Sequence, residues 1–176
     1  MDVSTRKYIE EHLNDDINKL ALSKFPDNID KQFVIRQIQA RQLLKKKLPS
    51  WSDNDELLFP RRLSLEQCSS ELTAKYKRTI SRKDAKTQSR DASMAPAIKH
   101  IDTSLHRILV DLTGGMGVDT AFLSDNFDET IYVESQAELC ELARHNFKIL
   151  NKNIEVVNAK ESSHLYFLQN MNLHLY

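Results

Sequence analysis

Residues 111–120 read DLTGGMGVDT, and this stretch holds Gly114, Gly115 and Gly117, the only three glycines in a chain of 176 residues. It follows the apolar run at 108–110 and precedes residues with helical spacing. Glycine has no Cβ, so it permits a sharp turn and lets a ligand approach the backbone closely. A glycine cluster between a strand and a helix is typical of a nucleotide-binding loop, so this stretch predicts both a fold class and a site.

The segments around the glycine loop alternate between strand-like and helix-like patterns. Short apolar runs at 108–110, 131–133 and 154–157 indicate strands, and helical spacing occurs at 118–125 and 135–150. This order predicts a parallel sheet whose strands are joined by right-handed crossover helices. We therefore predict an α/β fold with an all-α N-terminal region, in which three parallel strands with crossover helices form the first half of a Rossmann-like sheet.

Acidic residues follow the first two predicted strands, and they indicate what the loop binds. Asp111 stands at the mouth of the loop, where it would repel a phosphate and attract an ammonium or sulfonium centre. Glu134 is placed to accept hydrogen bonds from ribose hydroxyls. One acidic residue suited to a cation and one suited to a ribose favour S-adenosylmethionine over NAD as the ligand. A Walker phosphate loop is excluded, because no Lys-Ser/Thr pair follows the glycines.

The sequences VDLTGGMGVDTAFLS and YVESQAELCELARHNFKIL resemble the first half of a class I, Rossmann-fold, S-adenosylmethionine-dependent methyltransferase. The likeness is greatest to RNA methyltransferases similar to the cap guanine-N2 type, in particular to bacterial methyltransferases that carry a THUMP-like domain. Asp111, Gly115, Gly117 and Glu134 match the family's motifs, whereas Thr113 replaces the first glycine of the usual pattern. ARQLLKKKLPSW through LSLEQCSSELTAKYK resembles the helical region before the first motif in that bacterial group.

The resemblance implies S-adenosylmethionine as cofactor and RNA, either tRNA or rRNA, as substrate. The residues of the predicted cofactor site lie in the loop or at the strand ends beside it: Asp111, Thr113, Gly114, Gly115, Gly117, Asp119, Thr120 and Glu134.

The chain departs from the family in its catalytic motif. Family members place Asp/Asn-Pro-Pro-aromatic after a fourth strand, but all four prolines of this chain precede the glycine loop. We therefore expect an N-terminal fragment with weak or no activity in isolation, and we assign no catalytic residue. The missing strand would leave an edge of the first strand exposed, which offers a surface for self-association.

The first 80 residues carry helical patterns. An apolar stripe from Tyr8 to Ala21 predicts one helix that ends near Pro26, and Asp30 is the expected N-cap of a second helix that stops before Pro49. Arg41 falls in the apolar arc of that second helix, where we expect its stem to lie on the core and its guanidinium to pair with a carboxylate.

Two segments are predicted to start with a capping box. Ser64 with Gln67 indicates a third helix, with Leu63 and Cys68 in staple positions, and Ser135 with Glu138 indicates the start of the second crossover helix. The predicted domains are a helical domain at 1–80, a linker or mobile loop at 81–100 and a partial Rossmann-like cofactor domain at 101–176, with a further helix at 162–171.

The third helix is rich in small polar residues, and two interpretations of them stay open. Ser64, Gln67, Ser69, Ser70 and Thr73 form either a solvated helix face or a polar lid over a pocket. Periodicity alone does not choose between these interpretations.

Charge is unevenly distributed, although the formal net charge is zero. Residues 36–90 hold 14 basic and 6 acidic residues, which suits either an RNA-binding surface or a solvated helical face. Trp51 and Phe59 are expected in the core rather than stacked on bases. The predicted RNA contacts are Lys45, Lys46, Lys47, Arg61, Arg62, Lys75, Lys77 and Arg78.

The remaining composition argues against secretion, membrane spanning and a metal centre. The N-terminus has no apolar leader, no run of about 18 apolar residues occurs, and the histidines show no ligand spacing. Two cysteines without a CxxC motif suit a reducing cytoplasm. The alternative functions are a non-catalytic RNA- or protein-binding helical module with a vestigial nucleotide fold, and an NAD-linked oxidoreductase.

Overall fold

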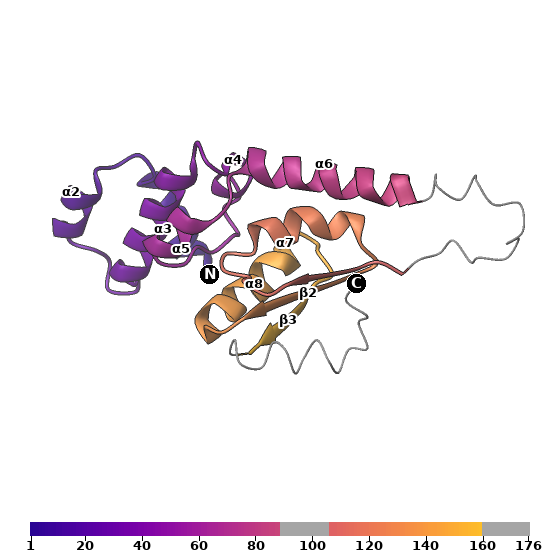
Figure 1. The fold of residues 1–176 in the computed structure, drawn as a ribbon. Helices are drawn as coiled ribbons and strands as arrows, with labels where there is room; N and C mark the ends of the chain where they lie inside the picture. The colour runs from indigo at the N-terminus through magenta and orange to yellow at the C-terminus, as the bar shows by residue number, and fades with distance from the viewer. Residues whose placement is uncertain (89–105, 160–176) are drawn as a thin grey trace, which may run out of the picture.

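The computed structural model describes residues 1–88 and 106–159, and it joins a helical region to a small parallel sheet (Figure 1). The predicted helix at 162–171 and the part of the predicted linker beyond residue 88 lie outside the described residues. The helices of the first region are α1 (Val3–Glu11), α2 (Ile17–Leu22), α3 (Lys31–Leu44), α4 (Pro49–Ser52), α5 (Arg62–Gln67) and α6 (Glu71–Gln88).

The single helix predicted for the first apolar stripe is wrong, because the chain forms α1 and α2 with a break between them. Asp16 caps α2 by accepting a hydrogen bond from the backbone N–H of Lys19 at 2.9 Å. Acidic and amide side chains compete for backbone N–H groups and so favour caps over helix interiors. The apolar residues on both sides of the break still face one core, formed by Ile9, Leu20, Val34 and Ile38.

The second helix is confirmed as α3, with Asp30 accepting a hydrogen bond from the N–H of Phe33 at 3.0 Å. The carboxylate partner expected for Arg41 is wrong. Arg41 is 4% exposed, and its guanidinium donates to four backbone carbonyls, those of Ser52, Asn54, Asp55 and Leu57, at 2.7–3.1 Å. Arg41 therefore holds together an irregular segment of chain whose carbonyls have no strand or helix to pair with.

Gln37, one turn before Arg41 on α3, secures the end of the same segment. Its side-chain amide donates to the carbonyl of Phe59 and accepts from the N–H of Phe59, both at 3.0 Å and both buried. Trp51 and Phe59 are 2% and 1% exposed, which confirms their place in the core.

The predicted third helix divides into α5 and α6, and neither begins with the predicted capping box. Arg61 stands at the N-cap position of α5 without a side-chain hydrogen bond, and Leu63 is 65% exposed, so the staple is also wrong. The cap of α6 comes instead from Ser70, whose hydroxyl accepts from the N–H of Thr73 at 3.1 Å. Because α6 continues to Gln88, the first part of the predicted linker is helical.

Glu71 fixes the corner between α4 and α6. Its carboxylate accepts a hydrogen bond from the N–H of Ser50 at 2.9 Å and pairs with Lys75 at 2.5 Å. Burial acts to raise the pKa of Glu71, but the hydrogen bonds from Lys75 and Ser50 outweigh it and leave the pKa below its usual value. The carboxylate is therefore charged and satisfies an N–H group at the start of α4.

The predicted α/β unit is confirmed. Its elements are β1 (Ile108–Asp111), α7 (Val118–Leu123), a 3-10 turn η2 (Ser124–Asn126), β2 (Glu129–Glu134), α8 (Ala137–Ile149) and β3 (Glu155–Asn158). The three strands are parallel in the order β1-β2-β3, with Val110 opposite Ile131 and Val133 opposite Val157. Among the described strands, β1 lies at one edge of the sheet (Figure 1).

One hydrophobic core joins the helical region to the α/β unit. It contains Leu48, Trp51 and Leu57 from the first region together with Met116 and Phe147 from the second. Polar contacts reinforce it: the side-chain amide of Asn146 on α8 pairs with both the N–H and the carbonyl of Leu58, at 2.9 and 2.8 Å. The helical region is thus packed directly against the helices that support the sheet.

No helix in the described part of the chain is both long enough and apolar enough to cross a membrane. Within residues 1–88 and 106–159, no three His, Cys, Asp or Glu side chains are grouped as they would be around a metal ion.

Candidate functional site

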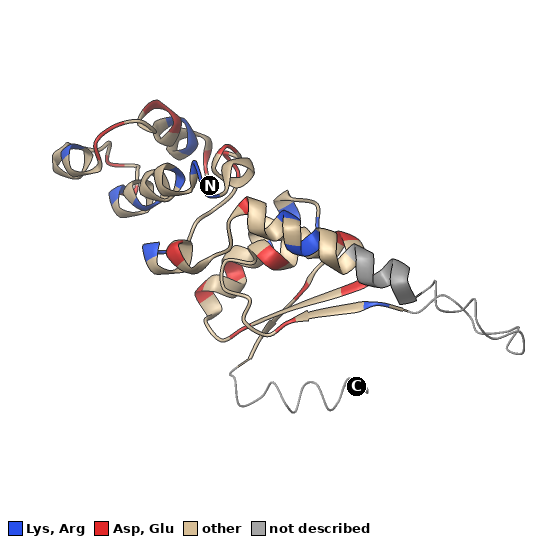
Figure 2. Cartoon of the chain, turned by 45° about the horizontal axis from the view of Figure 1, so that its top comes forward, with Lys and Arg blue, Asp and Glu red and all other residues tan. Residues whose placement is uncertain are grey.

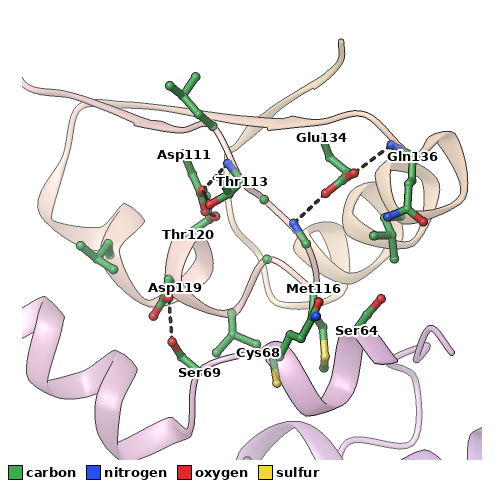
Figure 3. A pocket seen from close by; sticks show the side chains of 18 of the residues that line it. Ser64, Cys68, Ser69, Asp111, Thr113, Met116, Asp119, Thr120, Glu134 and Gln136 are labelled. Atoms are coloured by element: carbon green, nitrogen blue, oxygen red, sulfur yellow. Dashed lines mark hydrogen bonds between the residues drawn. The ribbon is translucent and has the colours of Figure 1, made fainter. Parts of the chain in front are cut away.

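A cleft of about 730 Å³ opens beside the glycine loop (Figure 3). The ends of β1 and β2 and the start of α7 form one side of the cleft, and the corner between α5 and α6 forms the other. Every residue of the predicted cofactor site lines it: Asp111, Thr113, Gly114, Gly115, Gly117, Asp119, Thr120 and Glu134. Pockets of roughly 300–1,000 Å³ hold cofactor-sized ligands, so the cleft has room for a nucleoside with a side chain.

The three glycines are required for different reasons, and only Gly115 is required by the geometry of the turn alone. A Cβ on Gly114 would lie 2.3 Å from Cε2 of Tyr132, and a Cβ on Gly117 would lie 2.7 Å from Cζ of Phe147. Gly115 adopts φ +52 and would place its Cβ in nearly open space. Gly114 and Gly117 are therefore needed because the loop lies against buried aromatic rings, and Gly117 also adopts φ +78. From the sequence, the glycines were expected to serve a sharp turn and ligand approach, and the contacts with the rings were not predicted.

Asp111 at the end of β1 holds the loop and the helix that follows it. Its carboxylate accepts hydrogen bonds from the N–H of Thr113 at 3.1 Å and from the hydroxyl of Thr120. The side chain is therefore a structural support as well as a charge in the cleft. A carboxylate has about four acceptor positions, so it keeps some capacity for a further donor.

Glu134 at the end of β2 is 8% exposed and connects three segments. One carboxylate oxygen accepts from the N–H of Gly115 at 3.0 Å, and the other accepts from the hydroxyl of Ser135 at 3.1 Å and the N–H of Gln136 at 2.8 Å (Figure 3). It satisfies the start of α8 in place of the predicted Ser135–Glu138 capping box, which is wrong: Gln136 is the N-cap residue and makes no side-chain cap bond.

Tyr132 contacts the glycine loop through both its ring and its hydroxyl. The ring is fully buried and meets Phe147 edge-on, with 5.5 Å between centroids, while the hydroxyl donates to the carbonyl of Gly115 at 2.6 Å. Burial, followed by the nearby negative charge of Glu134, raises the pKa of Tyr132 well above its usual range. The phenol therefore stays protonated and acts as a fixed donor to the loop.

The small polar residues of α5 and α6 do not all fit one of the two interpretations, a polar lid over a pocket or a solvated helix face. Ser64, Gln67 and Ser69 line the cleft and form its second wall, as the lid interpretation predicts. Ser70 and Thr73 do not line the cleft and instead bond to each other at the start of α6.

Cys68 lies in the same wall, next to Met116 of the loop (Figure 3). Burial raises the pKa of the Cys68 thiol above its usual value, and the positive charge of Lys47 offsets this only in part. Cys68 is thus a neutral, partly buried thiol that packs against the core.

Asp119 connects the two walls of the cleft. One of its carboxylate oxygens accepts a hydrogen bond from the hydroxyl of Ser69 at 2.7 Å and pairs with Lys77 at 2.6 Å. The remaining oxygen is buried without a hydrogen-bond partner among the described residues.

Most of the predicted RNA contacts are used within the protein. Lys47 donates to the carbonyls of Leu65 and Glu66 at the end of α5, at 2.9 and 2.7 Å. Four more form ion pairs with acidic residues: Arg62, Lys75, Lys77 and Arg78. In Figure 2, basic and acidic positions are interspersed along the helical region.

Lys45, Lys46 and Arg61 differ from the other predicted RNA contacts. They are exposed, and none has an ion-pair partner among residues 1–88 and 106–159. Lys77 lines the cleft, whereas Lys45, Lys46 and Arg61 do not.

Sequence reasoning missed several residues of the cleft. Met116 and Val118 lie within or beside the loop and are buried, and Gln136 and Leu139 come from the start of α8. Their position just after Glu134 is a signal that could have found Gln136 and Leu139, because residues after a strand-end acid start the helix that faces the same crevice.

Comparison with known proteins yields one informative match. No protein-family model and no curated protein matches the chain. A crystal structure of a "putative methyltransferase" from Porphyromonas gingivalis W83 matches with a TM-score of 0.69 and 25% sequence identity, over 96% of this chain. The chain spans 38% of the length of that structure. The architecture is that of a partial Rossmann-like methyltransferase fold, and the likeness supports a methyltransferase assignment in general terms.

Proposed function

We propose that this chain binds S-adenosylmethionine in the cleft beside the glycine loop and serves in methyl transfer to RNA, either tRNA or rRNA. The observation that carries the proposal is the charge of the cleft. Among the residues that the structure describes, three carboxylates line it, those of Asp111, Asp119 and Glu134, with a single amine, that of Lys77. This surplus of negative charge favours a sulfonium ligand and disfavours a pyrophosphate. The structural likeness to a methyltransferase points the same way.

The cleft residues fit the parts of this cofactor. Glu134 has three donors for its four acceptor positions, so a ribose hydroxyl can add to it or replace the N–H of Gly115. Asp111 supplies negative charge beside the loop. Bound there, the cofactor supplies an electrophilic methyl group, and the residues of the chain bind it, orient it and limit its contact with water.

Calorimetric titration at low salt tests the choice of ligand. We expect S-adenosylmethionine to bind at least ~10-fold tighter than NADH, because NADH brings two phosphate charges into a negatively charged cleft. Equal or tighter binding of NADH would reject the proposal in favour of a dinucleotide site.

Glu134→Gln is expected to weaken S-adenosylmethionine binding by roughly 10- to 100-fold, because hydrogen bonds to a charged acceptor contribute about 1.5–3 kcal/mol. The amide removes the negative charge and replaces one acceptor oxygen with an NH₂ group, which cannot accept from a ribose hydroxyl or from the N–H of Gly115. Calorimetry of the purified variant measures the loss.

Glu129→Gln is the matched control for Glu134→Gln. It is the same change on the same strand at the opposite end, where Glu129 is exposed and pairs with His106 at 2.9 Å. We expect the affinity of this variant to equal that of the unchanged protein, so a similar loss in both variants would show a general effect on β2 and not a ribose contact.

The RNA part of the proposal relies on Lys45, Lys46 and Arg61, the exposed predicted contacts that have no ion-pair partner among the described residues. Binding of a mixed tRNA fraction is expected to weaken with salt, and Lys45→Ala with Lys46→Ala should reduce the slope of log K against log salt by roughly 1.5. The double variant Arg62→Ala, Lys75→Ala removes two cations already paired with acids and should change the slope far less. Identical slopes for the two double variants would contradict this assignment.

A further inference from the structure

Asp119 joins the helical region to the start of α7, directly after the glycine loop. It is the second residue of α7, and Gly117 is the N-cap. Its carboxylate is held by the hydroxyl of Ser69 at 2.7 Å and the amine of Lys77 at 2.6 Å, and the amine also reaches the Ser69 hydroxyl at 3.2 Å. Three groups from α7, α6 and the turn before α6 therefore meet at one point, and Figure 3 shows the contact between Asp119 and Ser69.

The next residue of α7, Thr120, is held from the other side. It is 1% exposed, and its hydroxyl donates to Asp111 at the end of β1. The loop at 113–117 thus connects the end of β1 to the start of α7. The start of α7 is itself attached to β1 through Thr120 and to the helical region through Asp119. A change in either attachment alters the position of the loop.

The polar part of the attachment to the helical region, at Asp119, depends on Lys77 and Ser69. One oxygen of Asp119 accepts both outside donors, while the other is buried without a partner among the described residues. Without the amine, a partly buried carboxylate would keep only the Ser69 hydroxyl as an outside donor. Such a carboxylate is poorly compensated, so the start of α7 would be held less firmly.

We propose that Lys77 and Ser69 are positioning residues for the ligand loop: they hold the start of α7 through Asp119, so that attachment of the helical region and occupancy of the cleft favour each other. This inference rests on the proposed function, because the ligand is S-adenosylmethionine. Linkage makes the coupling reciprocal, so a ligand that binds the ordered loop also strengthens the contact between the two regions.

Arg78 provides a matched control for Lys77. It neighbours Lys77 on α6 and also joins the helical region to the end of α7, through Asp125 of η2 at 3.1 Å. Neither Arg78 nor Asp125 lines the cleft. Lys77 and Arg78 thus make similar ion pairs between the same two regions, and only one of the pairs adjoins the loop.

Calorimetry with S-adenosylmethionine is expected to show about 5- to 10-fold weaker binding for Lys77→Met and less than ~2-fold for Arg78→Met, within the usual range of coupling between sites. Lys77→Arg should restore most of the affinity. In an Asp119→Asn background, Lys77→Met should add no further loss, because the amine acts through Asp119. Equal losses for Lys77→Met and Arg78→Met, no loss in either, or an undiminished loss in the Asp119→Asn background would overturn the proposal.

A readout without ligand separates this inference from the proposed function. Amide hydrogen exchange at 114–119 in the unliganded protein is expected to accelerate in Lys77→Met and to stay unchanged in Arg78→Met. If the unchanged protein does not bind S-adenosylmethionine, the proposed function fails, and exchange still decides the positioning role. Unchanged exchange in Lys77→Met would reject that role whatever the ligand.

Discussion

Gly114→Ala is expected to abolish ligand binding and to lower the free energy of unfolding by about 3 kcal/mol or more, at the upper end of the cost of overpacking a core. The added methyl carbon would lie 2.3 Å from Cε2 and 2.5 Å from Cζ of Tyr132. The ring cannot move aside easily, because it is fully buried against Phe147 and its hydroxyl donates to the carbonyl of Gly115. Urea denaturation and calorimetry measure the two losses.

Gly115→Ala is the matched control for Gly114→Ala. Its Cβ would meet only the carbonyl oxygen of Thr113 at 3.5 Å, so the cost comes from its φ of +52 alone and should be about 1 kcal/mol. Tyr132→Leu added to Gly114→Ala removes the clashing ring atoms and should recover part of the lost stability. If Gly114→Ala proves no more destabilising than Gly115→Ala, the close contact between loop and ring does not exist in solution.

Arg41→Met is expected to reduce the free energy of unfolding by about 3–5 kcal/mol, because removing one partner of a buried polar network leaves the other groups unsatisfied. Four backbone carbonyls lose their donor, and no side-chain change can remove a carbonyl. Thermal and urea denaturation measure the loss.

Two further variants separate the hydrogen bonds of Arg41 from its charge. Arg41→Lys keeps the charge but offers three donors at one point instead of a planar fork, so it should recover less than half of the loss. Arg36→Met removes a neighbouring arginine of α3 whose ion pair with Glu138 is 3.9 Å long, and should cost less than about 1 kcal/mol. Full stability of Arg41→Lys would show that position 41 needs only a cation.

The α/β unit was predictable because its signals are local. Each strand is a short apolar run that ends at a polar residue, and each crossover helix has its own apolar spacing. The three strands, their parallel order and the cofactor-loop residues of the cleft follow from these patterns and from the crossover rule. The glycines marked the right place, but the reason for two of them, the rings of Tyr132 and Phe147, depends on residues distant in the sequence.

Errors at helix ends arose where a residue outside the expected motif supplies the hydrogen bond. At α8, Ser135 and Glu138 match a capping box, yet Gln136 is the N-cap residue and its N–H donates to the carboxylate of Glu134. Between α1 and α2, Asp16 forms a cap in the middle of an unbroken apolar stripe. A local sequence pattern indicates which residues could cap a helix. It does not show which of them does so, because that depends on where the chain enters the helix.

Contacts between segments that are distant in the sequence could not be predicted from local patterns. Arg41 binds backbone carbonyls, which every residue possesses, so composition could not identify its partners. The pairing of Lys77 with Asp119 likewise joins segments whose proximity comes only from packing of α6 on α7. The same packing explains why three of the small polar residues of α5 and α6 line the cleft while two do not.

Nuclear magnetic resonance of protein labelled with ¹⁵N only in glycine tests the central claim most directly, because the three glycines of the chain all lie in the loop. We expect three backbone amide signals, all of which shift saturably on titration with S-adenosylmethionine. The signal of Gly115 should shift most, since its N–H donates to Glu134. Three signals that stay fixed at high S-adenosylmethionine concentration, or that shift with NADH or pyrophosphate instead, would contradict the account.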